Sequence, residues 1–364
     1  MLTDFRNYSS LRLDLDPRPV VLTGANGAGK TNLLEALSYL TPGRGLRGAG
    51  LDAAIRIGAD AFAVAATVAR SGQKTDIGTG HRHGETGRTV RIDRQPAPSV
   101  GALGEIVRAL WLTPSMDGLF TGPASDRRRF LDRLVLTLDP GHAGRVGDFE
   151  KAMRQRNRVL EDPRPDDRWL DGIEQTMAER AVAVALARAD AVARLQALLD
   201  ARGSGVFPVP RIAMTGAFEE ILRGGHAAVD VEADYRDRLA TTRPRDAASG
   251  RTLAGPHRSD LEVIHAARGL PAALGSTGEQ KGLLIALILA HARLVTAASG
   301  GMAPLLLLDE IAAHLDDMRR SALFAEVLAL GAQAWMTGTD RALFADIAGD
   351  AQGFEVSEGA VSPV

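Results

Sequence analysis

The chain of 364 residues contains no cysteine, which excludes disulfide bonds and any zinc site built from thiolates. It also lacks an excess of charge of either sign. Its 43 lysines and arginines face 45 aspartates and glutamates, so the net charge is only −2. No global basic field can therefore attract nucleic acid, and any nucleic-acid site on this protein must be local.

Long apolar runs are scarce as well. The best one, residues 283–290, is cut by His291 and Arg293 and is too short to span a bilayer. The start of the chain has no charged segment followed by an apolar one, which is the pattern of a signal peptide. We therefore expect a cytoplasmic protein that does not act at a membrane.

What the chain does contain is a glycine-rich segment, residues 24–31, that fits the phosphate-binding pattern G-x-x-x-x-G-K-[ST]. A short apolar stretch precedes it and leucines at helical spacing follow it, so the loop is predicted to join a buried strand to a helix. Backbone N–H groups and the positive helix end then converge on an anion. Lys30 would reach the β- and γ-phosphates, and the Thr31 hydroxyl would bind Mg²⁺. The nucleotide ligands predicted in this region are Gly24, Ala25, Asn26, Gly27, Ala28, Gly29, Lys30, Thr31 and Asn32.

A pair of acids near the other end of the chain narrows the possible classes of phosphate-loop protein. The four leucines at 305–308 predict a buried strand, which ends in Asp309 and Glu310. We expect Asp309 to hold Mg²⁺ through water, and Glu310 to polarise the water that attacks the γ-phosphate of ATP. Lys30, Asp309 and Glu310 are therefore the predicted catalytic residues of an ATPase. Taken alone, a buried strand that ends in two solvated acids remains an alternative.

A serine and a glycine open an apolar helix about thirty residues before that strand. Hydroxyl and N–H groups at a helix start can bind a phosphate, although the same residues also suit an ordinary N-cap. The order of the three segments resembles the ABC-type ATPase head, in which the signature of one subunit closes on the nucleotide of the other. The resemblance implies a signature that acts in trans, formed by Ser276, Thr277, Gly278, Glu279 and Gln280.

Two further positions agree with that resemblance. Asp316, in the segment 313–316, resembles the D-loop that runs along the dimer seam. Residues 333–338 then predict another buried strand, and by resemblance Thr339 occupies the switch position after it. Transporter ATPases carry histidine at this position, so Thr339 counts against a transporter.

The middle of the chain predicts an insertion in the head, for which 364 residues leave ample room. Residues 62–70 and 89–93 alternate like strands, with a turn-rich stretch at 78–87 between them, which predicts an antiparallel layer. Two helices are predicted at 148–160 and 169–199, separated by a segment with two prolines, and they are expected to form an antiparallel arm. From 203 to 251 we expect loops that return to the head.

Most of the chain, from residue 5 to residue 345, resembles the RecF family. The matching segments, in the expected order, are residues 5–8, 24–36, 122–132, 155–157, 255–260 and 309–320. The resemblance implies an α/β fold: an ABC-type P-loop ATPase head, with a mixed sheet, flanking helices and an antiparallel β layer, plus an inserted α-helical arm subdomain. The expected domains are residues 1–112 and 241–364 for the head and 113–240 for the arm. The predicted nucleotide ligands also include Arg6 and Asn7, in the opening segment.

The family resemblance also implies a function. By this resemblance the chain forms an ATP-dependent homodimer that clamps duplex, gapped or single-strand/double-strand junction DNA and hydrolyses ATP slowly. The dimer helps RecO and RecR to load RecA in the nucleoid. Two alternatives stay open. One is a transporter-type ATPase, against which Thr339 speaks. The other is a nucleotide-gated scaffold that binds ATP and partners, does not act on DNA and hardly hydrolyses.

Local arginines are the candidates for holding DNA backbone phosphates. They are Arg44 and Arg47 in a glycine-rich loop, and the triple-arginine segment Arg127, Arg128 and Arg129. The triple segment has an alternative, a solvated helix start paired with Asp126 and Asp132. Arg154, Arg156 and Arg158 fall on different faces of a predicted helix, so we expect them to be solvated rather than to form one stripe.

Overall fold

The computed structural model of the chain describes residues 1–70, 72–203 and 205–364. It divides into two compact units: unit 1 comprises Met1–Asp117, Ser204–Pro208 and Ser276–Val364, and unit 2 comprises Gly118–Gly203 and Val209–Gly275. Residues 241–275, which we expected in the head, fall in unit 2. The reason is that β10 (Asp260–His265) pairs along its length with β9 (Pro210–Thr215), so the two strands cannot belong to different units.

Unit 1 is built on a six-stranded sheet of order β15-β14-β3-β13-β12-β8. The strands are parallel except for the terminal hairpin of β14 and β15. Their bounds are β3 Val20–Thr23, β8 Ala109–Leu112, β12 Leu305–Leu308, β13 Ala334–Gly338, β14 Gln352–Ser357 and β15 Ala360–Pro363. The central strands are apolar and buried along almost their whole length, as expected for parallel strands covered on both faces.

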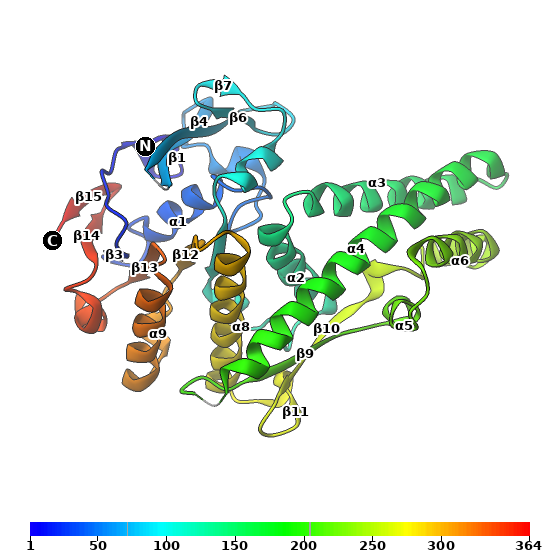
Figure 1. Cartoon of the computed structure of the whole chain (residues 1–364). Helices are drawn as coiled ribbons and strands as arrows, with labels where there is room; N and C mark the ends of the chain where they lie inside the picture. The colour runs from blue at the N-terminus through cyan, green and yellow to red at the C-terminus, as the bar shows by residue number, and fades with distance from the viewer. Residues whose placement is uncertain (71, 204) are drawn as a thin grey trace. The chain divides into compact units, whose positions relative to one another are not determined.

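Three α-helices belong to this unit: α1 Lys30–Ser38, α8 Thr277–Ala298 and α9 Asp317–Leu330. Short 3-10 helices complete it: η1 Leu51–Ala54, η2 Val100–Glu105, η3 Pro114–Met116, η6 Ala312–His314 and η7 Arg341–Ile347. Helices α8 and α9 lie side by side (Figure 1). By length and composition alone α8 could cross a membrane, but 78% of its most apolar window is buried inside the protein, as in a core helix.

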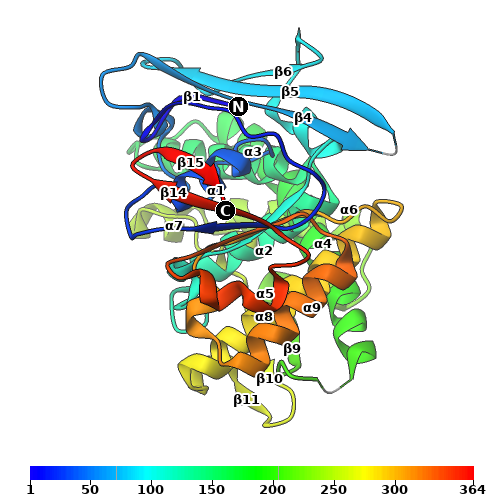
Figure 2. The same ribbon diagram turned by 90° about the vertical axis from the view of Figure 1, so that its left-hand side faces the viewer.

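A second sheet of unit 1 is antiparallel and has the order β2-β1-β4-β5-β6-β7. Its strands are β1 Leu2–Phe5, β2 Tyr8–Leu11, β4 Ala61–Arg70, β5 Gln73–Arg82, β6 Thr89–Ile92 and β7 Gln95–Pro96. Figure 2 shows β1, β4, β5 and β6 lying together as one layer. This confirms the antiparallel layer, but the turn-rich stretch expected at 78–87 begins only at residue 83, because β5 continues to Arg82. Glycine is needed inside this strand, since a Cβ on Gly80 would lie 2.8 Å from the carbonyl oxygen of Phe62 on β4.

The core of unit 1 joins the antiparallel layer to the main sheet and to α1. Phe5 and Phe62 from the layer pack edge to face, with ring centroids 5.3 Å apart. Phe5 also packs against Tyr39, directly after α1, at 5.9 Å. The same buried cluster includes Leu22 of β3 and Leu307 of β12. The layer therefore supports the helix that begins at Lys30.

Unit 2 is mainly helical. Its elements are α2 Ala124–Leu138, α3 His142–Leu160, α4 Asp167–Arg202, β9 Pro210–Thr215, α5 Ala217–Arg223, α6 Ala228–Thr241, α7 Arg243–Ser249, η4 Pro256–Arg258, β10 Asp260–His265, β11 Leu270–Pro271 and η5 Ala272–Leu274. The two predicted arm helices correspond to α3 and α4, which run side by side (Figure 1). Asp166 caps α4 by accepting hydrogen bonds from the N–H groups of Arg168 and Trp169.

The loops expected from 203 to 251 are wrong, because this stretch contains β9, α5, α6 and α7. Helix α6 buries Val231, Tyr235 and Leu239, which repeat at a spacing of four residues, and it packs on α4. Apart from the exposed Val229, its other positions are charged or small, so the apolar pattern is short and the mixed charges around it obscure it.

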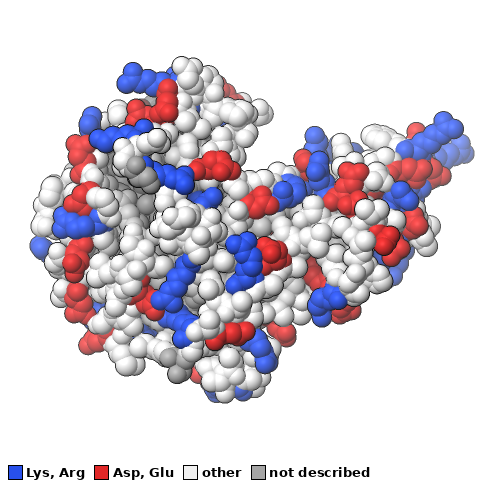
Figure 3. Space-filling view, viewed as in Figure 1, with Lys and Arg blue, Asp and Glu red and all other residues white. Residues whose placement is uncertain are grey.

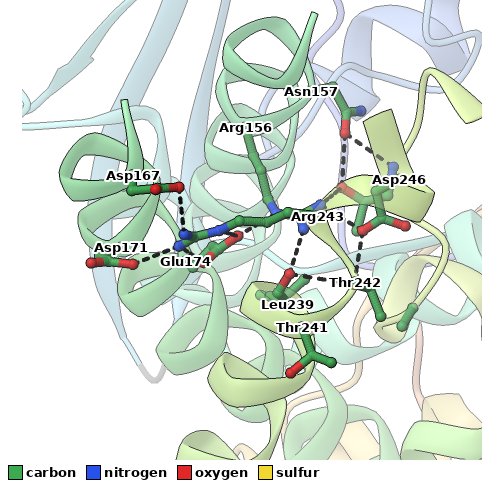
Figure 4. Close-up of polar contacts among 12 residues, drawn as sticks. Arg156, Asn157, Asp167, Asp171, Glu174, Leu239, Thr241, Thr242, Arg243 and Asp246 are labelled. Carbon is green, nitrogen blue, oxygen red and sulfur yellow. Dashed lines mark hydrogen bonds and ion pairs between the residues drawn. The ribbon is translucent and has the colours of Figure 1, made fainter. Parts of the chain in front are cut away.

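A buried polar cluster holds the helices of unit 2 together (Figure 4). Arg156 of α3 has a fully buried side chain, which contradicts the expectation of a solvated arm residue. Its guanidinium donates to Glu174 (2.8 Å), to Asp246 (2.7 Å), to the Thr252 hydroxyl (2.9 Å) and to the carbonyl oxygen of Leu239 (2.7 Å). Elements α3, α4, α6 and α7 therefore meet at one arginine side chain.

Candidate nucleotide site

The glycine-rich loop lies between the end of β3 and the start of α1, as the motif predicts. Its backbone needs glycine at two positions, where φ is positive and a Cβ would also be too close to a neighbouring atom. Gly24 has φ 145°, and a Cβ there would lie 2.2 Å from the carbonyl oxygen of Val356. Gly29 has φ 115°, and a Cβ there would lie 2.5 Å from the Asn7 side chain. The loop is therefore packed closely from behind, while the N–H groups that open α1 are in the position where a helix binds an anion.

Lys30, the first residue of α1, turns back over this loop. Its side chain is buried, and its ammonium donates hydrogen bonds to the carbonyl oxygens of Gly24 (2.7 Å) and Ala25 (2.9 Å). Burial lowers the pKa of Lys30, while the carboxylates of Glu310 and Asp309 act in the opposite direction. A cation held over the loop, next to an anionic edge, is suited to the β- and γ-phosphates of a nucleotide.

Thr31 and Asp309 meet although they are 278 positions apart in the sequence. The Thr31 hydroxyl donates to the Asp309 carboxylate, at 2.9 Å from Oδ1 and 3.0 Å from Oδ2. This contact arises because β3 and β12 flank β13 in the parallel sheet, so their carboxyl ends reach the same edge. The hydroxyl keeps its lone pairs for a cation while its proton points to the Asp309 carboxylate.

This pair fits Mg²⁺ with Thr31 as the direct ligand and Asp309 holding a coordinated water. In the described part of the chain, no group of three or more His, Cys, Asp or Glu side chains could hold a metal ion. A magnesium ion at this edge would take its remaining ligands from phosphate oxygens and water, which is the usual arrangement for Mg²⁺ at nucleotide sites.

Glu310 is held in an uncommon backbone conformation. Its φ is 50°, in the left-handed region that residues with a side chain rarely adopt. Its N–H donates a hydrogen bond to the Thr337 hydroxyl at 2.8 Å. Residues kept in such conformations cost free energy, persist only where neighbouring contacts fix them, and cluster at functional sites. The left-handed conformation takes the backbone out of the extended line of β12, which ends at Leu308.

The opening segment supports the loop from behind. Asn7 donates to the carbonyl oxygen of Ala28 (3.2 Å), and Tyr8 donates to that of Gly29 (3.0 Å). Burial raises the pKa of Tyr8 well above its ordinary value, so the phenol remains a donor. Asn32 donates to the side-chain oxygen of Asn7 at 2.7 Å. Asn7 thus lies at the loop, where it was expected, and Tyr8 is a further contact that the motif did not reveal.

Arg6, which was also predicted to bind nucleotide, has its ion-pair partner on α1. Its guanidinium binds the buried carboxylate of Glu35 on α1, with two hydrogen bonds of 2.8 and 2.7 Å. Arg47 binds the same carboxylate and also donates to Asn32 at 2.8 Å. Glu35, on the helix that follows the loop, was not singled out from the sequence. Its carboxylate binds both Arg6, a predicted nucleotide ligand, and Arg47, a predicted DNA contact.

The signature residues form the start of α8. Ser276 is its N-cap: the Ser276 hydroxyl accepts from the N–H of Glu279 (3.3 Å), and the Glu279 carboxylate accepts from the N–H of Ser276 (2.8 Å). The ordinary N-cap alternative is thus realised. Ser276, Thr277 and Gly278 are exposed, and Gln280 is half-buried. An N-cap and a ligand in trans are compatible, because the exposed residues remain accessible to a second copy of the chain.

The D-loop and switch residues lie as follows. Asp316 caps α9 by accepting from the N–H of Arg319 at 2.8 Å. Thr339 is exposed, one residue beyond the end of β13. The hydroxyl that reaches the acidic edge belongs to Thr337 instead, since it donates to Asp309 at 2.8 Å. A threonine inside a run of buried strand residues was the signal that could have pointed to it.

Known proteins match this chain along its whole length. The family model for the RecF/RecN/SMC N terminal domain matches residues 1–349. The DNA replication and repair protein RecF of Brucella abortus is 56% identical over 367 residues, covering 100% of this chain and 95% of that protein. The protein of the same name from Mesorhizobium japonicum is 54% identical over 366 residues, covering 100% of this chain and 96% of that protein. The chain belongs to the RecF family.

Solved structures agree with the fold of that family. The recombination mediator protein RecF-ATPrS in the RecFOR pathway matches with a TM-score of 0.87 at 22% identity, over 100% of this chain and 96% of that chain. The Smc head domain with an extended coiled coil, derived from Pyrococcus furiosus, matches with a TM-score of 0.54 at 14% identity, over 100% of this chain and 94% of that chain. These likenesses show that the chain has the fold of RecF and of the Smc head domain, which confirms the expected fold class. The RecF family is one of DNA replication and repair proteins, which confirms the broad role implied by the resemblance.

Two of the three arginines that were predicted as DNA contacts in the triple segment of this RecF-family chain have partners within unit 2. Arg127 forms two hydrogen bonds of 2.8 Å with Asp260, and this ion pair raises its pKa. Arg128 donates to the carbonyl oxygen of Ser259 at 2.6 Å. Arg129 is 77% exposed and pairs with Asp126, so the predicted pairing with the local acids holds only for this residue.

Arg44, Arg47 and Arg129 are therefore the exposed members of the predicted DNA-contact set. Arg44 has no ion-pair partner among the residues that the structure describes, and Arg47 shares the Glu35 carboxylate with Arg6. On the face shown in Figure 3, blue and red side chains are interspersed, without a continuous basic stripe. Local arginines, rather than a broad basic surface, fit the near-zero net charge.

Replacing Arg44 by glutamine is expected to weaken duplex DNA binding severalfold at low salt. It should also reduce the slope of log affinity against log salt concentration by about 1, because one phosphate contact is lost. Fluorescence anisotropy over a salt series measures both quantities. Arg12→Gln is the matched control, because Arg12 is 76% exposed and pairs only with Asp14. An unchanged affinity and slope for Arg44→Gln would remove Arg44 from the DNA surface.

Proposed function

We propose that this RecF-family chain is an ATPase that clamps DNA as an ATP-dependent homodimer. The observation that carries the proposal is the assembly of Lys30, Thr31, Asp309 and Glu310 at one edge of a parallel sheet, with Thr31 bonded to Asp309 at 2.9 Å. Cation, hydroxyl and two carboxylates are the set needed to bind Mg²⁺·ATP and to direct water onto its γ-phosphate.

The hydrolysis step follows from these positions. ATP places its phosphates on Gly24–Thr31, where the N–H groups of α1 and Lys30 stabilise negative charge. Glu310 accepts a proton from the attacking water, and the bond between the γ-phosphorus and the bridging oxygen breaks to give ADP and phosphate. When bound, Mg²⁺ neutralises the charge on the β- and γ-phosphate oxygens.

The dimer supplies the remaining part of the site. The exposed residues Ser276, Thr277 and Gly278 cap the γ-phosphate of the partner's ATP, with Glu279 and Gln280 behind them, and Asp316 and Thr339 line the seam. ATP therefore favours the closed dimer by differential affinity, and hydrolysis releases it. Arg44 and Arg129 hold backbone phosphates of duplex, gapped or junction DNA without reading its sequence.

The relatives suggest the setting of this clamp. Solved members are described as recombination mediators in the RecFOR pathway. We therefore place RecR and RecO as protein partners, with RecA loading at DNA gaps as the indirect result, in the nucleoid-associated cytoplasm. Slow turnover that DNA stimulates suits a clamp whose lifetime ATP controls.

Sedimentation velocity with ATP and Mg²⁺, with and without gapped duplex DNA, tests the proposal when phosphate release is followed in parallel. We expect ATP-dependent dimers and faster turnover with DNA. Lys30→Met should remain a monomer, because it lacks the cation that binds the phosphates. A wild-type chain that stays monomeric with ATP would contradict the clamp. Dimers that hydrolyse ATP without any response to DNA would instead favour another ABC-type class, and dimers without turnover a nucleotide-gated scaffold.

A further inference from the structure

We infer that Thr337 is a positioning residue for ATP hydrolysis, because its single hydroxyl fixes both acids at the end of β12. The inference rests on the proposed ATPase function and names a residue outside the phosphate loop and the acidic pair. Thr337 lies on β13, between β3 and β12, and its side chain is fully buried. The register pairs Leu308 with Met336, so Thr337 stands beside the first residue after β12, which is Asp309.

The directions of its two hydrogen bonds are fixed by the atoms involved. The N–H of Glu310 can only donate, so the Thr337 oxygen accepts from it, at 2.8 Å. The one hydroxyl proton of Thr337 is then free to go to Asp309 Oδ1, also at 2.8 Å. Both distances are in the normal range for such bonds. One side chain thereby sets the backbone of Glu310 and the rotation of the Asp309 carboxylate together.

The Glu310 backbone requires such support. With φ at 50° it occupies a region that costs free energy for a residue with a side chain. The bond from its N–H to Thr337 favours this conformation over the extended one that would continue the strand. If the bond is lost, the Glu310 carboxylate is no longer held in one direction toward the attacking water.

The orientation of the Asp309 carboxylate also depends on Thr337. Its Oδ1 accepts one hydrogen bond from Thr31 and one from Thr337. Thr31 lies in the phosphate-loop motif at the start of α1, whereas Thr337 lies on β13 inside the main sheet. Thr337 therefore ties the metal-facing carboxylate to the sheet itself. Outer contacts of this kind typically change metal affinity or activity about 10- to 100-fold when removed.

Two substitutions separate a positioning role from a packing role. Thr337→Val keeps the branched shape and removes the hydroxyl, whereas Thr337→Ser keeps the hydroxyl and removes a methyl group. Positioning predicts that kcat for ATP falls about 10- to 100-fold in T337V and stays within about threefold in T337S. It also predicts that KM for ATP changes little in T337V, because the phosphate contacts of Lys30 and α1 remain. Packing alone predicts the reverse order of the two variants.

The magnesium dependence gives a second readout. The Mg²⁺ concentration that half-saturates binding of a fluorescent ATP analogue should rise about tenfold in T337V and stay near wild type in T337S. Thr79→Val is the matched control, since Thr79 is equally buried on β5 of the same unit and its hydroxyl donates only to the carbonyl oxygen of Thr89, at 3.0 Å. If T337V does not fold, Thr337→Cys replaces it, because a thiol of similar size is a weak donor.

The outcomes separate this inference from the function on which it rests. A folded T337V that matches wild type in kcat and in Mg²⁺ dependence overturns the positioning role, as does a T337S that is as impaired as T337V. A wild-type chain that binds no ATP at all refutes the proposed function itself. A wild-type chain that binds ATP without measurable turnover leaves the Mg²⁺ titration to decide.

Discussion

Replacing Glu310 by glutamine is expected to lower ATP turnover about 10²- to 10⁴-fold while ATP binding persists, so that the chain accumulates as an ATP-bound dimer. Glutamine has nearly the same shape and keeps the backbone N–H that donates to Thr337. It cannot accept a proton from the attacking water. The bonds from Lys30 and Thr31 are untouched, so the closed state should form and fail to reopen.

Single-turnover phosphate release together with sedimentation in ATP and Mg²⁺ measures the two effects separately. Glu355→Gln is a suitable control, because Glu355 is an exposed carboxylate on β14 of the same sheet. It should turn over and dimerise like wild type. A Glu310→Gln protein that stays monomeric with ATP would remove the link between hydrolysis and clamp opening, and one with wild-type turnover would show that Glu310 is not the base.

The nucleotide site could be predicted because its chemistry is local in the sequence. The phosphate loop, Lys30 and Thr31 form one continuous motif, and Asp309 and Glu310 stand together after a run of leucines. Parallel strands carry both groups to the same edge of the sheet, so the motif and the strand pattern were sufficient. The two long arm helices were likewise visible, because an apolar spacing sustained over many residues is a strong signal.

The partners of individual side chains could not be predicted, because they are remote in the chain. Arg127 binds Asp260, 133 positions away, and Arg156 binds Asp246, 90 positions away. A run of arginines near acids looks the same in the sequence whether its charges meet solvent, DNA or a carboxylate from another element. Thr337 was overlooked for the same reason, since the carboxylate it serves lies 28 positions earlier.

The prediction of loops from 203 to 251 was wrong for a different reason, because the helices and the strand in this region are short. Helices α5 and α7 have seven residues each, and β9 has six. Gly216 and Gly224 flank α5, and Gly250 ends α7, so the glycines that suggested a continuous loop mark the limits of short elements. Their stability comes from packing on other elements, β9 on α4 and β10, α5 on α4, and α7 on α3, which the local sequence does not reveal.

The second large effect is expected at Arg156. The residues of the cluster around it lie outside the candidate nucleotide site. The Arg156 guanidinium is fully buried, and its two carboxylate partners, Glu174 and Asp246, are 1% exposed. Removing one member of a buried charged network leaves the others uncompensated in a medium that solvates them poorly. Arg243, which also binds the Glu174 carboxylate, at 3.1 and 2.5 Å, offsets only part of this loss.

Arg156→Leu is therefore expected to lower the free energy of unfolding of unit 2 by about 3–5 kcal/mol. Hydrogen exchange of the α3 and α4 amides measures this directly, because a chain with two units need not unfold in one step. Arg154→Leu is the matched control: Arg154 lies on the same helix, is 67% exposed and pairs with Glu150 at 3.6 Å, so its removal should cost no more than about 1 kcal/mol. Equal protection in the two variants would mean that the buried cluster adds nothing to the stability of unit 2. With the expected difference, α3, α4, α6 and α7 depend on one buried arginine for their association, whereas the phosphate loop, in unit 1, should still bind ATP.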